Sequence, residues 1–198
     1  MGDRWGPEGP PDEAYSRVSR DLEAVTAAFA AYLDGLRDQL LARFVCRVRP
    51  ATGPELQRLG HGTRDRDEVD VYAVEPADPG AATLLVDRYL WEGGTSVSLA
   101  AGRSAASEAP DCFCDACDED SDEMIDTVDR FVSMVGSGFR EFRRPVDPDA
   151  FGRAGNTPRG WLEVGCEWAG GHTIGASAGV RGEVFTAEWG PWPAPPQR

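Results

Sequence analysis

The chain has 198 residues, of which 34 are acidic, 20 are basic and none is lysine, so its formal net charge is −14. This charge disfavours general nucleic-acid binding, which relies on cations that displace counterions from phosphate, and the absence of lysine excludes a P-loop lysine and a pyridoxal Schiff base. With 41% hydrophobic residues, the composition is that of a globular domain with a sizeable core.

Residues 1–11 are rich in Gly, Pro and charge, lack the apolar core of a signal peptide, and are expected to be disordered. The longest uncharged helical stretch, 24–33, is far shorter than the roughly 20 residues that span a bilayer. Five cysteines, an odd number, do not suggest a disulfide framework. We therefore expect a cytoplasmic protein without a membrane partner.

The first periodic segment, residues 12–43, predicts a long amphipathic helix. Its apolar side chains recur at helical spacing, at Tyr15, Val18, Leu22, Val25, Phe29, Tyr32, Leu36 and Leu40. Asp12 follows two prolines and is the expected N-cap. Such a stripe is typical of a helix that covers a hydrophobic core.

Alternating apolar and polar residues predict strands after this helix, at 44–49, 69–74 and 83–91. The polar segment 51–68 is expected to be a loop. Gly93-Gly94 offers a tight turn into residues 95–101, so a β-hairpin is expected there.

A second helix is expected over residues 120–142, where Asp120 and Glu123 resemble a capping box. An apolar stripe follows the helical period, through Met124, Val128, Phe131, Val135 and Phe139. Pro145 ends the element. Three basic residues suit the negative end of the helix dipole, namely Arg140, Arg143 and Arg144.

Further strands are predicted around and after a Gly170-Gly171 turn, over 162–168, 172–178 and 183–189. The proline-rich residues 191–198 are expected to form an extended or disordered tail. We therefore expect a single α+β domain over residues 12–190, with two long amphipathic helices packed on a mainly antiparallel β-sheet.

The most distinctive feature is the cysteine-rich segment 111–120, which reads Asp-Cys-Phe-Cys-Asp-Ala-Cys-Asp-Glu-Asp. The spacing of Cys112, Cys114 and Cys117 lets a short loop fold three thiolates around one ion, as in tetrahedral zinc sites. Ten acidic residues and no basic one lie between 108 and 129. These carboxylates raise the pKa values of the thiols and so disfavour thiolates, whereas a bound cation would favour them. The segment therefore predicts a structural zinc site.

The spacing leaves the fourth zinc ligand open. We rank His172 and His61 first, because zinc readily accepts imidazole. The alternatives are a neighbouring carboxylate or a core cysteine, from Asp115, Asp118, Cys46 and Cys166. Both core cysteines lie on apolar strand faces, where cysteine is usually buried and inert, so we expect neither to bind the metal.

Two other chemistries compete for the same segment. Cys114 and Cys117 form a Cys-x-x-Cys pair before a helix, as in thioredoxin-like redox proteins, but the carboxylates oppose a low thiol pKa and no βαβ unit precedes the pair. Several aspartates match the ligand positions of a calcium loop, but Glu123 replaces its obligatory glycine. Thiolate binding of a metal is favoured over both.

No coherent catalytic set is found in the sequence. Gly175-Ala-Ser177-Ala-Gly179 matches the nucleophile-elbow pattern, but no helix is expected after the serine and no histidine follows it. No dinucleotide-binding glycine fingerprint opens a helix. We therefore expect a protein that is not an enzyme.

The Cys-x-Cys-Asp-x-Cys-Asp-Glu stretch at 112–119 and the tail Trp189-Gly-Pro-Trp192-Pro resemble a bacterial, chiefly actinobacterial, family of unknown function, DUF6226. The resemblance covers residues 44–192, and Phe113 stands where a small residue is expected. Because the family has no established activity, the resemblance implies an uncharacterised bacterial protein and no particular reaction.

The leading hypothesis is a non-enzymatic domain, stapled by zinc, that acts through contacts with an unidentified protein partner. One alternative is an acidic inhibitor or immunity-type protein that covers a basic partner surface. Its decoy face would consist of four carboxylates on the second helix and just before it, those of Asp118, Asp122, Asp126 and Asp129. The other alternative is a thiol-disulfide redox protein that uses Cys114 and Cys117. None of these hypotheses involves nucleic acid or a membrane.

Overall fold

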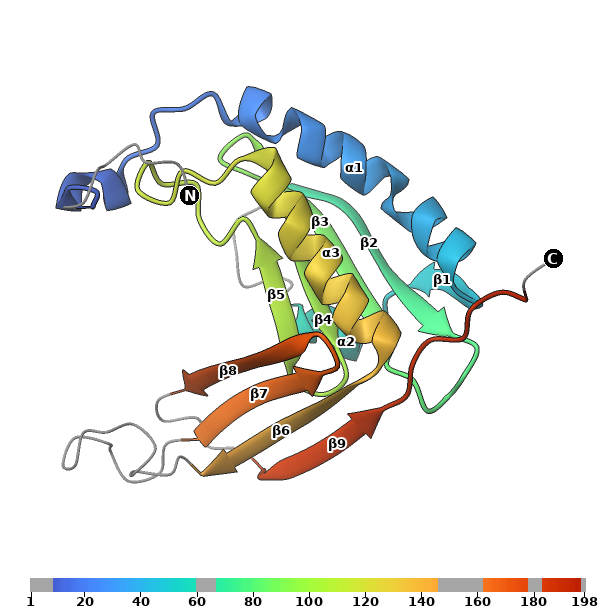
Figure 1. Cartoon of the computed structure of the whole chain (residues 1–198). Helices are drawn as coiled ribbons and strands as arrows, with labels where there is room; N and C mark the ends of the chain where they lie inside the picture. The colour runs from blue at the N-terminus through green and yellow to red at the C-terminus, as the bar shows by residue number, and fades with distance from the viewer. Residues whose placement is uncertain (1–8, 60–66, 146–161, 178–182, 197–198) are drawn as a thin grey trace.

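The computed structural model describes residues 9–59, 67–145, 162–177 and 183–196, and its fold is α+β with antiparallel sheets, as predicted (Figure 1). The helices in these ranges are α1 (Leu22–Arg43), α2 (Gly53–Arg58) and α3 (Ser121–Ser137). The first sheet has the order β1-β2-β3-β4-β5 and contains β1 (Cys46–Pro50), β2 (Asp67–Pro76), β3 (Leu84–Trp91), β4 (Gly94–Ala101) and β5 (Ala105–Ala109). The second has the order β8-β7-β6-β9 and contains β6 (Phe139–Pro145), β7 (Leu162–Trp168), β8 (Gly171–Ser177) and β9 (Phe185–Trp189). The expectation of one sheet was therefore wrong.

The two long helices, α1 and α3, pack against each other and on the first sheet (Figure 1). The core consists of apolar side chains from both helices and from one face of the sheet, including Phe29, Leu36, Met124, Val128, Leu84, Val86, Val97 and Leu99. Neither of these helices, nor α2, has the length and apolarity that a membrane crossing requires.

The first helix begins later than predicted. Asp12–Ser16 form a separate 3₁₀ turn, and α1 begins after Asp21, whose carboxylate accepts a hydrogen bond from the Ala24 amide. The apolar spacing through Tyr15 and Val18 misled the prediction, because both side chains are exposed. Most of the predicted disordered segment, residues 1–8, lies outside the described residues.

A short helix, α2, lies in the segment that was predicted to be a loop. Thr52 and Glu55 form a capping box, and Pro54 occupies the first turn, where its missing N–H costs nothing. Arg49 donates two hydrogen bonds to Glu55 and fixes the helix to β1. Leu59 follows α2 and packs on the far face of the first sheet, against Ala73, Leu85 and Ala100.

The second long helix has the predicted beginning and an earlier end. Asp120 and Glu123 form the capping box that the sequence indicated. The helix ends at Gly138, whose φ of 81° lies in the left-handed region that favours glycine. The chain then continues as β6, so three predicted helix-end residues are strand residues instead, namely Arg140, Arg143 and Arg144.

A buried carboxylate joins the two sheets. Glu141 on β6 has no exposed surface and accepts hydrogen bonds from the β4–β5 turn, from Arg103 N at 2.5 Å, Ser104 N at 2.7 Å and Ser104 Oγ at 2.8 Å. The Trp189 indole on β9 donates to the same carboxylate at 2.7 Å. At Gly102, where φ is 56°, a Cβ would lie 2.6 Å from a Glu141 oxygen. The turn therefore requires glycine.

The chain beyond β9 lies against the core. Trp192 is buried, its indole donates to the Ala82 carbonyl at 2.9 Å, and its amide donates to the Gly136 carbonyl at 2.9 Å. Its ring meets Phe44 edge-on, with 5.2 Å between centroids. The described part of the predicted tail is therefore anchored by Trp192 and by a hydrogen bond from the Val45 amide to the Pro193 carbonyl at 2.7 Å, although it forms no helix or strand.

Replacing Glu141 with alanine should destabilise the fold strongly, because several donors lose their acceptor. Each buried donor left unsatisfied costs about 1–3 kcal/mol, so we expect the free energy of unfolding to fall by at least about 3 kcal/mol. Urea denaturation measures it. Glu167→Ala removes the exposed partner of Arg140 and should cost less than about 1 kcal/mol. Equal losses in the two variants would contradict the role given to Glu141.

Candidate metal centre

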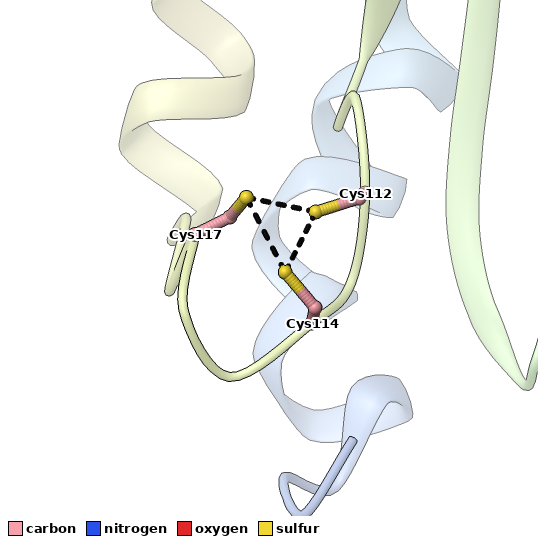
Figure 2. Close-up of side chains that lie close together, drawn as sticks. All are labelled: Cys112, Cys114 and Cys117. Atoms are coloured by element: carbon pink, nitrogen blue, oxygen red, sulfur yellow. Dashed lines mark hydrogen bonds between the residues drawn. The ribbon is translucent and has the colours of Figure 1, made fainter. Parts of the chain in front are cut away.

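Three cysteine sulfurs converge in the loop between β5 and α3 (Figure 2). Cys112 Sγ lies 3.0 Å from Cys114 Sγ and 2.8 Å from Cys117 Sγ, and the third distance, Cys114–Cys117, is 3.4 Å. In the described parts of the chain this is the only group of three or more Cys, His, Asp or Glu ligand atoms that lie within 4.8 Å of one another. Zinc–sulfur bonds of about 2.3 Å in a tetrahedron place sulfurs about 3.8 Å apart. A small outward shift of each sulfur would therefore admit an ion.

The middle of the loop is tied to the segment that precedes α1. Asp115 has no exposed surface and accepts hydrogen bonds from Arg17 Nε at 2.8 Å, Ser19 N at 2.9 Å and Ser19 Oγ at 2.8 Å. The Asp115 amide donates to the Arg17 carbonyl at 2.7 Å. The Arg17 guanidinium and the two Ser19 donors hold the pKa of Asp115 well below its usual range. Asp115 therefore positions the loop and has little capacity left for a metal.

Phe113 anchors the same loop in the core. Its side chain is buried, and its ring lies 5.6 Å from the Trp91 ring, centroid to centroid. At Gly94, the first residue of β4, a Cβ would lie 2.6 Å from Phe113 Cζ. Glycine at 94 therefore makes room for the bulky residue at 113, the position where a small residue was expected.

The C-terminal end of the loop is held by a second arginine. Arg20 Nη1 donates to the Glu119 carbonyl at 2.9 Å and lies 3.2 Å from Asp118 Oδ1. The Ser121 hydroxyl then donates to the Val25 carbonyl at 2.6 Å, which ties the first turn of α3 to α1. The middle and the C-terminal end of the cysteine loop are thus fixed to the N-terminal part of the chain.

The three thiols differ in their readiness to ionise. Burial opposes a charge on Cys114, but hydrogen bonds from the Cys112 thiol, the Cys117 amide and the Cys117 thiol outweigh it and lower the Cys114 pKa. The hydrogen bond with Cys112, together with burial, raises the pKa of Cys117. Burial, followed by the contact with Cys114, raises the pKa of Cys112. A bound cation would remove the repulsion that opposes ionising all three.

Of the two predicted imidazole ligands, only His172 belongs to the described residues, and it lies outside the cysteine cluster. His172 lies on β8 in the second sheet, where it is exposed and outside the group of close ligand atoms. His61 falls outside the described residues. Of the two neighbouring carboxylates, Asp115 is held by Arg17, and Asp118 pairs with Arg20.

The other two cysteines also lie outside the cluster. Cys46 Sγ is 3.7 Å from the Leu40 carbonyl, and burial raises the pKa of its thiol. Cys166 is buried on β7, where burial and the charge of Glu141 raise its pKa to about 11. Neither thiol belongs to the group of close ligand atoms.

A model of a family of unknown function, DUF6226, matches residues 1–196 of the chain. The chain therefore belongs to this family, which confirms the resemblance carried by the cysteine motif. The match extends over the N-terminal helix as well as the segment in which the resemblance was noted. Comparison with curated proteins and with solved structures gives no match.

Replacing Asp115 with alanine should free the segment before α1, so that it opens more often and trypsin cleaves more readily after Arg17 and Arg20. Loss of a charge-assisted hydrogen bond corresponds to about a tenfold change in a local opening equilibrium. We therefore expect cleavage after these arginines to become about tenfold faster, as followed by mass spectrometry. Asp126→Ala, at an exposed position of α3, is the matched control. Unchanged cleavage in Asp115→Ala would refute the anchoring role.

Proposed function

We propose that this member of the DUF6226 family is a non-enzymatic domain in which Cys112, Cys114 and Cys117 hold one structural zinc ion. The observation that carries the proposal is the convergence of three sulfurs, 2.8–3.4 Å apart, in a loop fixed at its middle and at its C-terminal end. Thiolates are soft ligands that zinc binds strongly, and a divalent cation offsets the dense negative charge of this segment.

Bound zinc would supply a cross-link and would not need to supply a reaction. The loop joins three parts of the chain: the extended segment before α1, through Asp115, the β3–β4 hairpin, through Phe113 against Trp91, and the first turn of α3. The site does not exist in the unfolded chain, so the free energy of metal binding contributes to folding. We infer that the ion stabilises this junction.

Two observations favour metal binding over redox chemistry. Cys114 has the lowered pKa, but the residue is only 9% exposed, so access for a disulfide substrate is poor. The more exposed Cys117 has a raised pKa, which disfavours a thiolate nucleophile. A third thiol, Cys112, in contact with both sulfurs is expected for a metal site and superfluous for a two-cysteine redox pair.

The acidic-decoy hypothesis draws less support from the same region. Two of its four carboxylates are engaged within the molecule: Asp129 accepts a hydrogen bond from the Tyr32 hydroxyl at 2.7 Å, and Asp118 pairs with Arg20. A surface that covers a basic partner needs carboxylates free to face it. We therefore propose that this segment stabilises the domain and does not cover a basic partner.

Metal analysis tests the proposal directly. Protein purified without chelators should contain about one equivalent of zinc. The Cys114→Ser variant should lose the zinc, and proteases should then cleave its loop near Phe113. The far-ultraviolet circular dichroism of this variant should stay close to that of the wild type, because the rest of the domain stays folded. Acidification should release the ion as well, because protons compete for the thiolates. Cys46→Ala and Cys166→Ala are the matched controls and should retain the metal.

Each contrary result has a clear meaning. Metal-free protein, with a readily alkylated Cys114 or Cys117 and an unaltered loop in Cys114→Ser, would reject the zinc site and favour the redox protein. Loss of the ion in Cys46→Ala or Cys166→Ala would make that residue a ligand. If the protein contains a metal other than zinc and Cys114→Ser loses it, the proposed metal site is retained and only the identity of the ion is corrected.

A further inference from the structure

A cavity of about 690 Å³ opens where the two sheets and α3 meet. One wall is the edge strand β5 with the turn before it, another is the middle of α3, and the third is the β7–β8 hairpin. Its volume lies within the range of pockets that hold small organic ligands. The cavity is separate from the cysteine loop, none of whose residues lines it.

The described lining combines an apolar floor with a cationic rim. Phe131 and Met134 of α3 and Val164 and Trp168 of β7 supply apolar surface. Arg130 carries the only permanent charge in this lining, and no Asp or Glu belongs to it. In a chain with 34 acidic and 20 basic residues, a described lining with one cation and no carboxylate favours a ligand with an acidic group.

Arg130 is placed to receive an acidic group. Its Nε donates to the Asp126 carbonyl at 3.3 Å and its Nη2 to Thr127 Oγ1 at 3.2 Å, so the guanidinium is held along α3 by neutral acceptors. Within the described residues no carboxylate forms an ion pair with it, whereas Arg140 on β6 pairs with Glu167 and Arg144 with Glu163. A guanidinium without a counter-ion is a ready partner for a ligand carboxylate or sulfonate.

The β7–β8 turn presents an aromatic side chain and an imidazole at the same cavity. At Gly170 a Cβ would lie 2.7 Å from Trp168 Nε1, so glycine lets the turn fold closely over the indole. His172 follows the turn and lines the cavity from β8. Trp168 and Phe131 therefore offer aromatic surface to a flat ring, and His172 adds a hydrogen-bonding group beside it.

We propose that this cavity binds a small aromatic compound with one acidic group, whose ring packs against Trp168 and Phe131 and whose acid binds Arg130. The charge of Arg130 complements the acidic group of the ligand, and the apolar side chains of the cavity bind its aromatic ring. The cavity is independent of the proposed zinc site, because the two share no residue.

Two fluorescent probes of nearly equal shape test the proposal. Anilinonaphthalene sulfonate is an aromatic anion, and N-phenylnaphthylamine is its uncharged counterpart. The native protein should bind one equivalent of the anion saturably and bind the neutral probe at least about tenfold more weakly, the factor expected when a charge-assisted hydrogen bond is absent. Near-ultraviolet circular dichroism should confirm that the protein stays native, since loosened proteins also bind such dyes.

Variants locate the binding. Arg130→Gln should weaken the anion about tenfold or more and leave the neutral probe unaffected, while Arg47→Gln, an exposed arginine on β1, should change neither. Ala106→Phe, at the exposed rim of the cavity, should weaken both probes. Equal affinity for the two probes, no saturable binding of the anion, or binding that survives both Arg130→Gln and Ala106→Phe would overturn the proposal.

Discussion

The arrangement of the two sheets depends on one buried charge. Glu141 has no exposed surface, and a carboxylate removed from water is tolerated only when its oxygens accept hydrogen bonds from the protein. Its donors come from two separate places, the β4–β5 turn through Arg103 and Ser104 and β9 through Trp189. The first sheet must therefore present that turn to the second, and a mismatch would leave the charge uncompensated.

The same turn is held from its other side by α2. Arg58, near the end of this short helix, donates to the carbonyls of Gly102 and Ala101 and to that of Ala105 at 3.2 Å. The amides of the turn thus donate to Glu141, and its carbonyls accept hydrogen bonds from Arg58. Gly102 is required in this turn, because a Cβ there would clash with Glu141. Because β5 leaves this turn directly, the position of the cavity wall follows from the position of Glu141.

Local signals predicted the elements whose determinants lie close together in sequence. The Asp120–Glu123 capping box, the hairpin at Gly93 and the approach of three cysteines within six positions of one another are of this kind.

The Ala- and Ser-rich strand β5 was not predicted, because it lacks the β-branched and aromatic residues typical of strands. The N-terminus of α1 was misplaced because residues 17–20 are held by Asp115 and Glu119, about a hundred positions away. The separation of His172 from the cysteines had no sequence signal at all, because it results from the division into two sheets.

Helix α3 connects the two candidate sites and explains why they can operate separately. The cysteine loop precedes its first turn, and the cavity lies along its middle, from Thr127 to Met134. The helix is fixed to α1 through Ser121, which donates to the Val25 carbonyl and accepts from the Phe29 amide. Its apolar stripe is buried in the core over several turns. The position of α3 therefore rests on packing and on these hydrogen bonds. An ion bound in the loop would stabilise the N-terminal junction, and the wall of the cavity would stay in place without it.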